Sequence, residues 1–196
     1  MILIAAALLI LAVGGCHTAA AETPAGSTLL TGNALDRVTV SFHPAGPSSS
    51  LAIRDNGRGA GQNVVQLYNI GDSFRFWLTK ADDYSYYIDF FGGADDYSPS
   101  NKRLDLSDND GYDTPGNVVH VVKGNKDATN KRWRFYRNPD GTYYIQNQAS
   151  GLYWGLQDSG YKDKNKLTQW SLSDGRTKRW EIEIIHTDNT PRPSAN

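Results

Sequence analysis

Aspartates that precede glycine or asparagine are the first residues of this sequence that could do chemistry. The run Asp108-Asn109-Asp110-Gly111 has the acidic character of a calcium-binding loop, but Leu106 stands where the first oxygen ligand of such a loop belongs. Asp55, Asp108 and Asp158 share another property, a position at the end of an apolar stretch and before a turn. An aspartate side chain at such a position commonly hydrogen-bonds the backbone of the turn. We therefore expect these aspartates to shape turns, and we predict no metal site.

Motifs of enzymes that use a nucleophile, a metal or a nucleotide are missing from the sequence. It contains no Gly-x-Ser-x-Gly, no His-Glu-x-x-His and no Gly-Lys-Ser/Thr, and the glycine-rich run 57–61 lacks the lysine of a phosphate-binding loop. One cysteine excludes an intrachain disulfide and a thiolate-rich zinc cluster. The 196 residues carry 20 Lys+Arg and 21 Asp+Glu, which argues against the basic face that binds nucleic acid. The sequence thus predicts a non-catalytic protein without a cofactor and without a nucleic-acid partner.

The single cysteine follows an apolar leader. Residues 1–15 are apolar or glycine throughout, a run too short for a typical membrane-spanning helix and typical of a signal peptide. The leader ends in Val13-Gly14-Gly15-Cys16, which resembles a bacterial lipobox except that no Lys or Arg precedes it. We expect export and a lipid anchor on Cys16 in the bacterial cell envelope, or secretion if cleavage instead follows residues 17–21. Small and polar residues predict a flexible tether over 16–36 and a disordered tail over 187–196.

The body of the chain, residues 37–186, contains three copies of one pattern. Lys131-Arg132-Trp133 is echoed by Lys178-Arg179-Trp180, and Tyr86-Tyr87-Ile88 is echoed by Tyr143-Tyr144-Ile145. Around these anchors, each copy has an apolar strand that runs into an aspartate, a second apolar strand and a closing aromatic residue. The copies span about 37–77, 78–136 and 137–186.

Apolar and polar residues alternate within each copy, which predicts β-strands. Turn sequences such as Asn138-Pro139-Asp140-Gly141 separate the strands. One copy of four short strands cannot bury its apolar face, so the three copies must share a core. A closed threefold arrangement of about twelve strands would also remove exposed strand edges. We expect the closing aromatics to meet on the common axis: Phe74, Trp133 and Trp180.

In order and spacing, the three copies resemble the ricin B-type β-trefoil lectins. The resemblance covers about residues 37–186, although the glutamine of the family's closing Gln-x-Trp is replaced in all three copies, by Asp72, Lys131 and Lys178. It implies an all-β fold, a β-trefoil of three four-stranded repeats with pseudo-threefold symmetry. It also implies a non-catalytic protein that binds a glycan or polysaccharide.

In each repeat, the resemblance implies a shallow pocket with an aspartate and an asparagine for sugar hydroxyls and an aromatic ring for the sugar's apolar face. The second repeat keeps Asp105 and Asn130, with Lys131 beside the asparagine and His120 at a position where the family has glutamine. Its stacking residue is Val122, so we expect Tyr112 to supply a ring. The second repeat is the predicted main site.

The first and third repeats keep fewer of these roles. The first has Gln66 and Tyr68, but Ala52 takes the place of the aspartate. The third has Trp170 as a stacking ring, but Gly155 replaces the aspartate and Thr168 the glutamine.

Two other functions remain open for such a fold. One is a protein-binding trefoil, for example the receptor-binding or delivery subunit of a multicomponent toxin, and the other is a protease inhibitor that presents a rigid loop. The insertion at 89–101 carries three aromatic residues and is the predicted place of a protein contact.

Overall fold

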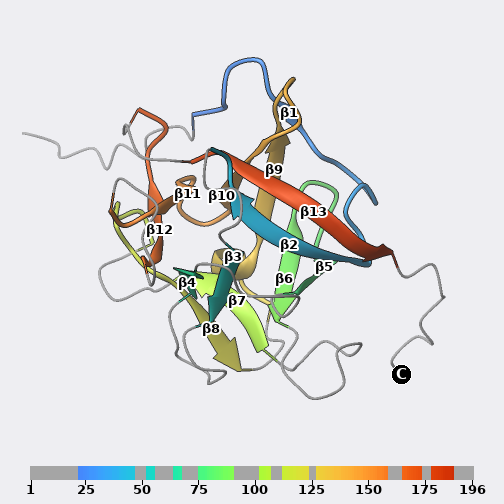
Figure 1. Ribbon diagram of the computed structural model, residues 1–196, viewed down its shortest axis with the longest axis horizontal. Helices are drawn as coiled ribbons and strands as arrows, with labels where there is room; N and C mark the ends of the chain where they lie inside the picture. The colour runs from blue at the N-terminus through green and yellow to red at the C-terminus, as the bar shows by residue number, and fades with distance from the viewer. Residues whose placement is uncertain are drawn as a thin grey trace, which may run out of the picture.

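A computed structural model of the chain describes residues 22–46, 52–55, 64–67, 75–90, 102–106, 112–123, 127–158, 165–173 and 178–187 (Figure 1). These residues form thirteen β-strands and one turn of 3₁₀ helix, η1 (Thr129–Lys131). No helix in this part of the chain is long and apolar enough to cross a membrane. The apolar leader with Cys16, the tail after residue 187 and residues 91–101 of the insertion lie outside the described residues.

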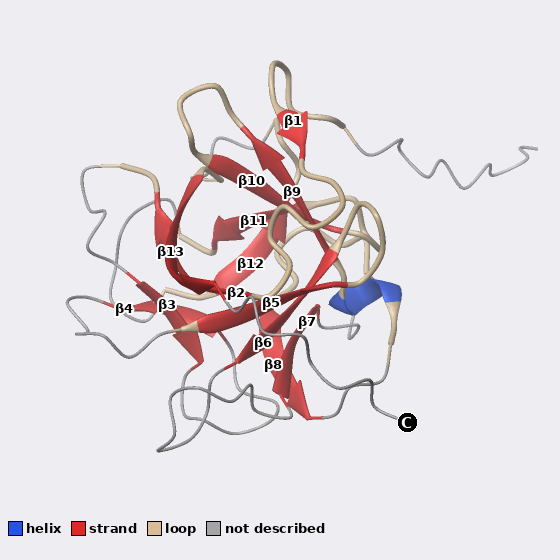
Figure 2. Cartoon of the chain, turned by 90° about the vertical axis from the view of Figure 1, so that its right-hand side faces the viewer, coloured by secondary structure: helices blue, strands red, loops and turns tan. Residues whose placement is uncertain are grey.

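Six strands form a closed antiparallel barrel. They are β2 (Val38–Pro44), β5 (Phe76–Lys80), β6 (Tyr86–Phe90), β9 (Trp133–Arg137), β10 (Tyr143–Asn147) and β13 (Trp180–Thr187). β2 pairs with β5, β5 with β6, β6 with β9, β9 with β10, β10 with β13, and β13 with β2 (Figure 2). Because the circuit closes, every barrel strand has a neighbour on both sides.

Each pair of barrel strands within a repeat is separated by a hairpin. The hairpins are β3 (Ala52–Asp55) with β4 (Val64–Leu67), β7 (Lys102–Leu106) with β8 (Val119–Lys123), and β11 (Tyr153–Leu156) with β12 (Leu167–Trp170). The chain therefore runs three times through barrel strand, hairpin and barrel strand. This order confirms the predicted β-trefoil of three four-stranded repeats.

Aromatic side chains fill the shared core. The ring of Trp154 makes edge contacts with Trp133 at 5.4 Å and with Trp180 at 5.8 Å between centroids, and all three residues are fully buried. Trp133 Nε1 donates to the carbonyl of Leu104 (3.5 Å), and Trp180 Nε1 donates to the carbonyl of Trp154 (3.4 Å). The closing tryptophans thus make the same contact in two successive repeats, as their expected core position requires.

The first repeat closes with a different phenylalanine from the one expected. Leu78 lies opposite Ile88 between β5 and β6, just as Phe135 lies opposite Ile145 between β9 and β10. This register makes Phe76, which is fully buried, the equivalent of Trp133. Phe74 lies outside the described residues. The closing aromatic of this repeat is therefore Phe76 rather than Phe74.

Residues 22–36, which their composition assigned to a flexible tether, pack against the barrel. The short strand β1 (Thr28–Leu29) pairs with β9, and the amide of Leu30 donates to the carbonyl of Phe135 (2.8 Å). Leu35 is buried in the core, and the hydroxyl of Tyr86 donates to the carbonyl of Gly32 (3.1 Å). Packing of Leu30 and Leu35 on the core, together with these hydrogen bonds, therefore holds the segment against the barrel.

Candidate functional site

The hairpin β7–β8 carries the predicted site of repeat 2 on its outward face. Its inward side chains, at most 1% exposed, belong to the core: Leu104, Leu106, Val119 and Val121. Because side chains alternate along a strand, Arg103, Asp105, His120 and Val122 face outward. Asp105 lies opposite His120 in the ladder, and Arg103 lies opposite Val122.

The helical turn η1 brings Asn130 onto the same face. The side-chain amide of Asn130 donates to the carboxylate of Asp105, and it also approaches the carbonyl of Leu106 (3.4 Å). Asp105 and Asn130 are largely buried, whereas His120 and Lys131 are partly exposed. The structure therefore brings together three of the residues predicted for repeat 2, Asp105, His120 and Asn130, and the side-chain amide of Asn130 holds the carboxylate in one orientation. Lys131 follows Asn130 in η1.

The ring expected to complete this pocket belongs to Tyr112, whose backbone contacts repeat 3. Val122 occupies the stacking position and is partly exposed. The carbonyl of Tyr112 accepts a hydrogen bond from Gln169 Nε2 (2.5 Å), which ties Tyr112 to β12 of repeat 3. The long turn of repeat 2 thus contacts the neighbouring repeat at Tyr112. That the Tyr112 ring stacks on a sugar at Asp105 stays a prediction.

Repeat 3 has an aromatic side chain that could stack on a sugar, Trp170, but no acidic residue at the position of Asp105 that could accept hydrogen bonds from sugar hydroxyls. Trp170 Nε1 donates to Thr168 Oγ1 (2.7 Å), and this hydroxyl donates to the carbonyl of Gly155 (3.0 Å). At its other end the indole meets Gly116, where a Cβ would lie 3.5 Å from Trp170 Cη2. The φ of Gly116 is +90°, a conformation that favours glycine. Trp170 is therefore held at both ends and remains partly exposed.

Of the residues discussed for repeat 1, the structure describes only the backbone of Ala52 and Gln66. Tyr68 and the side chain of Gln66 lie outside the described part of the structure. The backbone register places Gln66 opposite Ile53 and Ala52 opposite Leu67. In repeat 2 the equivalent positions, Asp105 and His120, are direct partners. In repeat 1, Ala52 therefore lies opposite the residue that follows Gln66 rather than opposite Gln66 itself.

A buried ion pair beside the site was not predicted from the sequence. Arg103 Nε donates to Asp89 Oδ1 (2.8 Å) and Arg103 Nη2 donates to Asp89 Oδ2 (3.2 Å). The guanidinium also lies 3.7 Å from the centre of the Tyr87 ring. In repeat 3 the equivalent positions hold two neutral residues, since Gln146 and Tyr153 lie opposite each other as Asp89 and Arg103 do.

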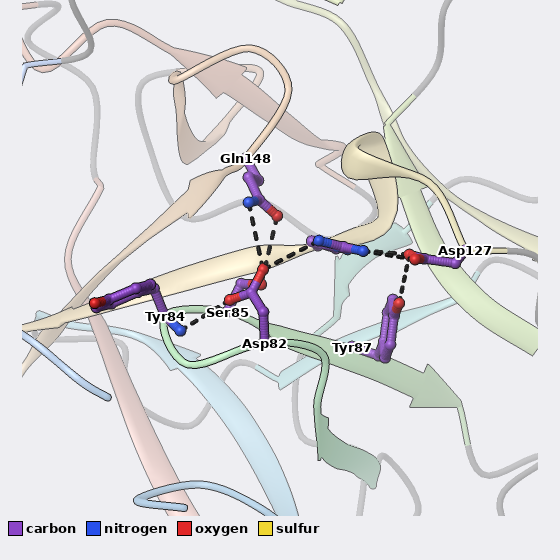
Figure 3. A network of polar contacts seen from close by, with 7 residues as sticks. Asp82, Tyr84, Ser85, Tyr87, Asp127 and Gln148 are labelled. Carbon is purple, nitrogen blue, oxygen red and sulfur yellow. Dashed lines mark hydrogen bonds and ion pairs between the residues drawn. The ribbon is translucent and has the colours of Figure 1, made fainter. Parts of the chain in front are cut away.

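A second polar network, centred on Arg132, joins Asp82 to Asp127 within the second repeat (Figure 3). Arg132 forms ion pairs with Asp127 (2.5 Å) and with Asp82 (3.1 Å), and the hydroxyl of Tyr87 donates to Asp127. Hydrogen bonds from Arg132 and Tyr87 lower the pKa of Asp127 from 3.8 to about 2. Arg179, the matching arginine of repeat 3, pairs with Asp140 in the same manner. In the second and third repeats, the arginine of the Lys-Arg-Trp sequence therefore forms an ion pair with an aspartate in the first turn of the same repeat.

We expect the carboxyl of Asp127 to titrate near pH 2 and to return toward 3.8 in Arg132→Gln. Since its pKa is lowered in the folded state, its contribution to stability is complete above pH 3.8 and is lost as the pH falls toward 2. Because the side chain is exposed, this contribution is small. Carboxyl-carbon NMR titration measures the shift, with Arg179→Gln as control. An unchanged midpoint in Arg132→Gln would contradict the assignment.

A serine, a histidine and a glutamate also meet on β2 and β13. Ser41 Oγ lies 2.9 Å from His43 Nε2, and Glu183 Oε2 lies 3.6 Å from the same nitrogen. A hydrolase relay places the acid on the other imidazole nitrogen, and His43 Nδ1 is buried here without a hydrogen-bond partner among the described residues. The grouping therefore lacks the geometry of a proton relay. Within the same described ranges, no three His, Cys, Asp or Glu side chains are placed to hold a metal.

Known proteins share this fold. Residues 129–191 match the family described as ricin-type β-trefoil lectin domain-like. The designed threefold-symmetric protein ThreeFoil is 20% identical, with a TM-score of 0.59 over 74% of this chain and 96% of that one. A mosquitocidal holotoxin is 16% identical, with a TM-score of 0.64 over 79% of this chain and 18% of that one. No curated protein matches the sequence.

A lectin of Polyporus squamosus is also similar, in a structure bound to the human-type influenza-binding epitope Neu5Acα2-6Galβ1-4GlcNAc. It is 12% identical, with a TM-score of 0.59 over 76% of this chain and 50% of that one. The chain thus spans nearly all of ThreeFoil but at most half of the toxin and lectin chains. The closed barrel and the three hairpins make the chain a β-trefoil, and its residues 129–191 match the ricin-type β-trefoil lectin domain-like family.

Proposed function

We propose that the protein is a non-catalytic carbohydrate-binding protein whose main site is the outward face of hairpin β7–β8. The family match and the similarity to the Polyporus squamosus lectin support carbohydrate binding in general. The observation that carries the site is the contact between Asp105 and Asn130 beside His120. A carboxylate that is already oriented by an amide accepts hydrogen bonds from sugar hydroxyls at little further entropic cost.

We expect Asp105→Ala to weaken glycan binding by roughly 10- to 100-fold, the usual range for a lost hydrogen bond to a charged group. A glycan array with free-sugar competition identifies the ligand, and titration calorimetry of wild type and variant measures the loss. Asp83→Ala, which removes an exposed carboxylate paired with Lys80, is the matched control. Sugar binding that survives Asp105→Ala unchanged would show that the site is elsewhere, and absence of any glycan binding would contradict the function.

We also propose export and lipid anchoring through Cys16, on the strength of the small residues that precede it. In a bacterial host, labelled palmitate should be incorporated into the wild type and lost in Cys16→Ser, with His17→Ala as control. Incorporation that survives the loss of Cys16 would contradict this proposal.

The similarity to a mosquitocidal holotoxin favours a second candidate function, a delivery subunit that binds a receptor. The insertion at 89–101 would then supply the protein contact. Co-purification of a partner that is lost when residues 91–101 are replaced, together with a negative glycan array, would favour this candidate.

A further inference from the structure

We propose that one saccharide chain spans repeats 2 and 3, with the hydroxyls of one sugar at Asp105 and Asn130 and the face of another sugar on Trp170. The ligand class is a linear chain of β-linked, equatorially substituted hexopyranoses. This inference rests on the proposed function and deepens it, because it replaces a single-sugar pocket by a site that needs an oligosaccharide.

The two repeats divide between them the groups that a sugar pocket needs. Repeat 2 has the carboxylate and amide but Val122 at the stacking position, while repeat 3 has the indole of Trp170 but Gly155 at the acceptor position. A sugar presents hydroxyls at its edge and C–H groups on its faces, so it requires both kinds of group. Neither hairpin alone supplies them.

A short segment connects the two half-sites, which are the pair of Asp105 and Asn130 in repeat 2 and Trp170 in repeat 3. Val118 bridges to Thr168, the amide of Gly116 donates to the carbonyl of Gln169 (2.7 Å), and the amide of Gln169 donates to the carbonyl of Asn117 (3.0 Å). Residues 116–118 therefore run along the edge of β12 and continue directly into β8. The two hairpins form one sheet-like surface at this point.

The two half-sites also lie on the same face of that surface. Along the segment, Asn117, Val119 and Val121 are buried, whereas Val118, His120 and Val122 are partly exposed. Directly paired residues share a face, so Trp170 and the fully buried Thr168 lie on the same side of the surface as Val118, and Asp105 lies on the same side as His120. The apolar side chain of Val118 lies between Trp170 and the polar pair of Asp105 and Asn130.

The separation sets the length of the ligand. Trp170 is two residues along β12 from Thr168, and His120 is two residues in the opposite direction from Val118, so the two half-sites lie about 13 Å apart at roughly 3.3 Å per strand residue. This exceeds one pyranose ring, so the two half-sites contact different sugars of one chain. Once one end is bound, the other binds at high effective concentration, and affinity should rise with chain length. Equatorial substitution fits because it leaves the flat C–H face that an indole requires.

The test uses N-acetylglucosamine and its β-1,4-linked oligomers, and glucose and its β-1,4-linked oligomers, each from one to six units. By calorimetry we expect one oligosaccharide per protein and an affinity gain of tenfold or more over the monosaccharide. Trp170→Ala should remove this gain, and Trp170→Phe, which keeps a ring, should retain most of it. Tyr84→Ala, which removes another exposed aromatic, is the control and should change nothing. Thermal unfolding of each variant checks that the fold is intact.

Different results overturn the two proposals. Suppose that the glycan array is positive and that Asp105→Ala abolishes binding. If the protein then binds monosaccharide and oligomer equally, or if Trp170→Ala leaves binding unchanged, the proposed function stands and the two-repeat site is contradicted. The same holds if the array is positive and neither oligomer series binds. A protein that binds no glycan at all loses both.

Discussion

Replacing Asp89 with alanine should lower the free energy of unfolding by about 3–5 kcal/mol, because Arg103 is then left as an uncompensated buried charge. Both side chains are about nine-tenths buried and are joined by two hydrogen bonds. The neighbouring ring of Tyr87 cannot replace the carboxylate, since a cation–π contact is worth less than a paired buried charge. Urea unfolding measures the loss, and Asp83→Ala, at an exposed ion pair, serves as the control.

Repeat 3 shows which substitutions in repeat 2 should restore the stability lost in Asp89→Ala. Gln146 and Tyr153 hold in repeat 3 the positions that Asp89 and Arg103 hold in repeat 2, and Tyr144 contacts Tyr153 edge-on at 6.1 Å. The double variant Asp89→Gln/Arg103→Tyr removes both charges and should recover most of the stability. A double variant as unstable as Asp89→Ala would show that the ion pair is needed for more than charge neutrality.

The repeats were predictable because a period of two and a closing aromatic recur at each strand end. The pair of Asp89 and Arg103 was not, since the residues are 14 apart, with the rest of the 89–101 insertion between them, and repeat 3 has no charged equivalent. The choice between Phe74 and Phe76 was also beyond the pattern. Two phenylalanines two residues apart share a strand face, and only the pairing of β5 with β6 decides which one closes the repeat.

The candidate site was predictable in its members but not in its connections. Asp105, His120 and Asn130 were found because they keep the order of the repeat. The bridge between Val118 and Thr168 was not found, because it joins two different repeats and leaves no periodic signal in the sequence. The same reason hid the packing of Tyr112 and Gly116 on repeat 3, where a long turn meets a neighbouring hairpin.

Trp154→Ala should be as damaging as the loss of Asp89, at about 3–5 kcal/mol, because it leaves a cavity at the centre of the core. Trp154 is fully buried and its ring contacts Phe42 (5.1 Å), Trp133 and Trp180. Urea unfolding, with an unchanged dependence on denaturant concentration, measures the effect.

Two milder substitutions separate the volume of Trp154 from its polar group. Leu104 is buried at the equivalent position of repeat 2, so Trp154→Leu keeps a residue that this fold accepts there and should cost less than alanine. Trp154→Phe should cost least, because it keeps a ring and removes an indole N–H that is buried without a hydrogen-bond partner among the described residues. If phenylalanine were as damaging as alanine, the N–H rather than the packing would carry the stability. The order Phe, Leu, Ala, by contrast, follows from a core in which one large ring joins three repeats.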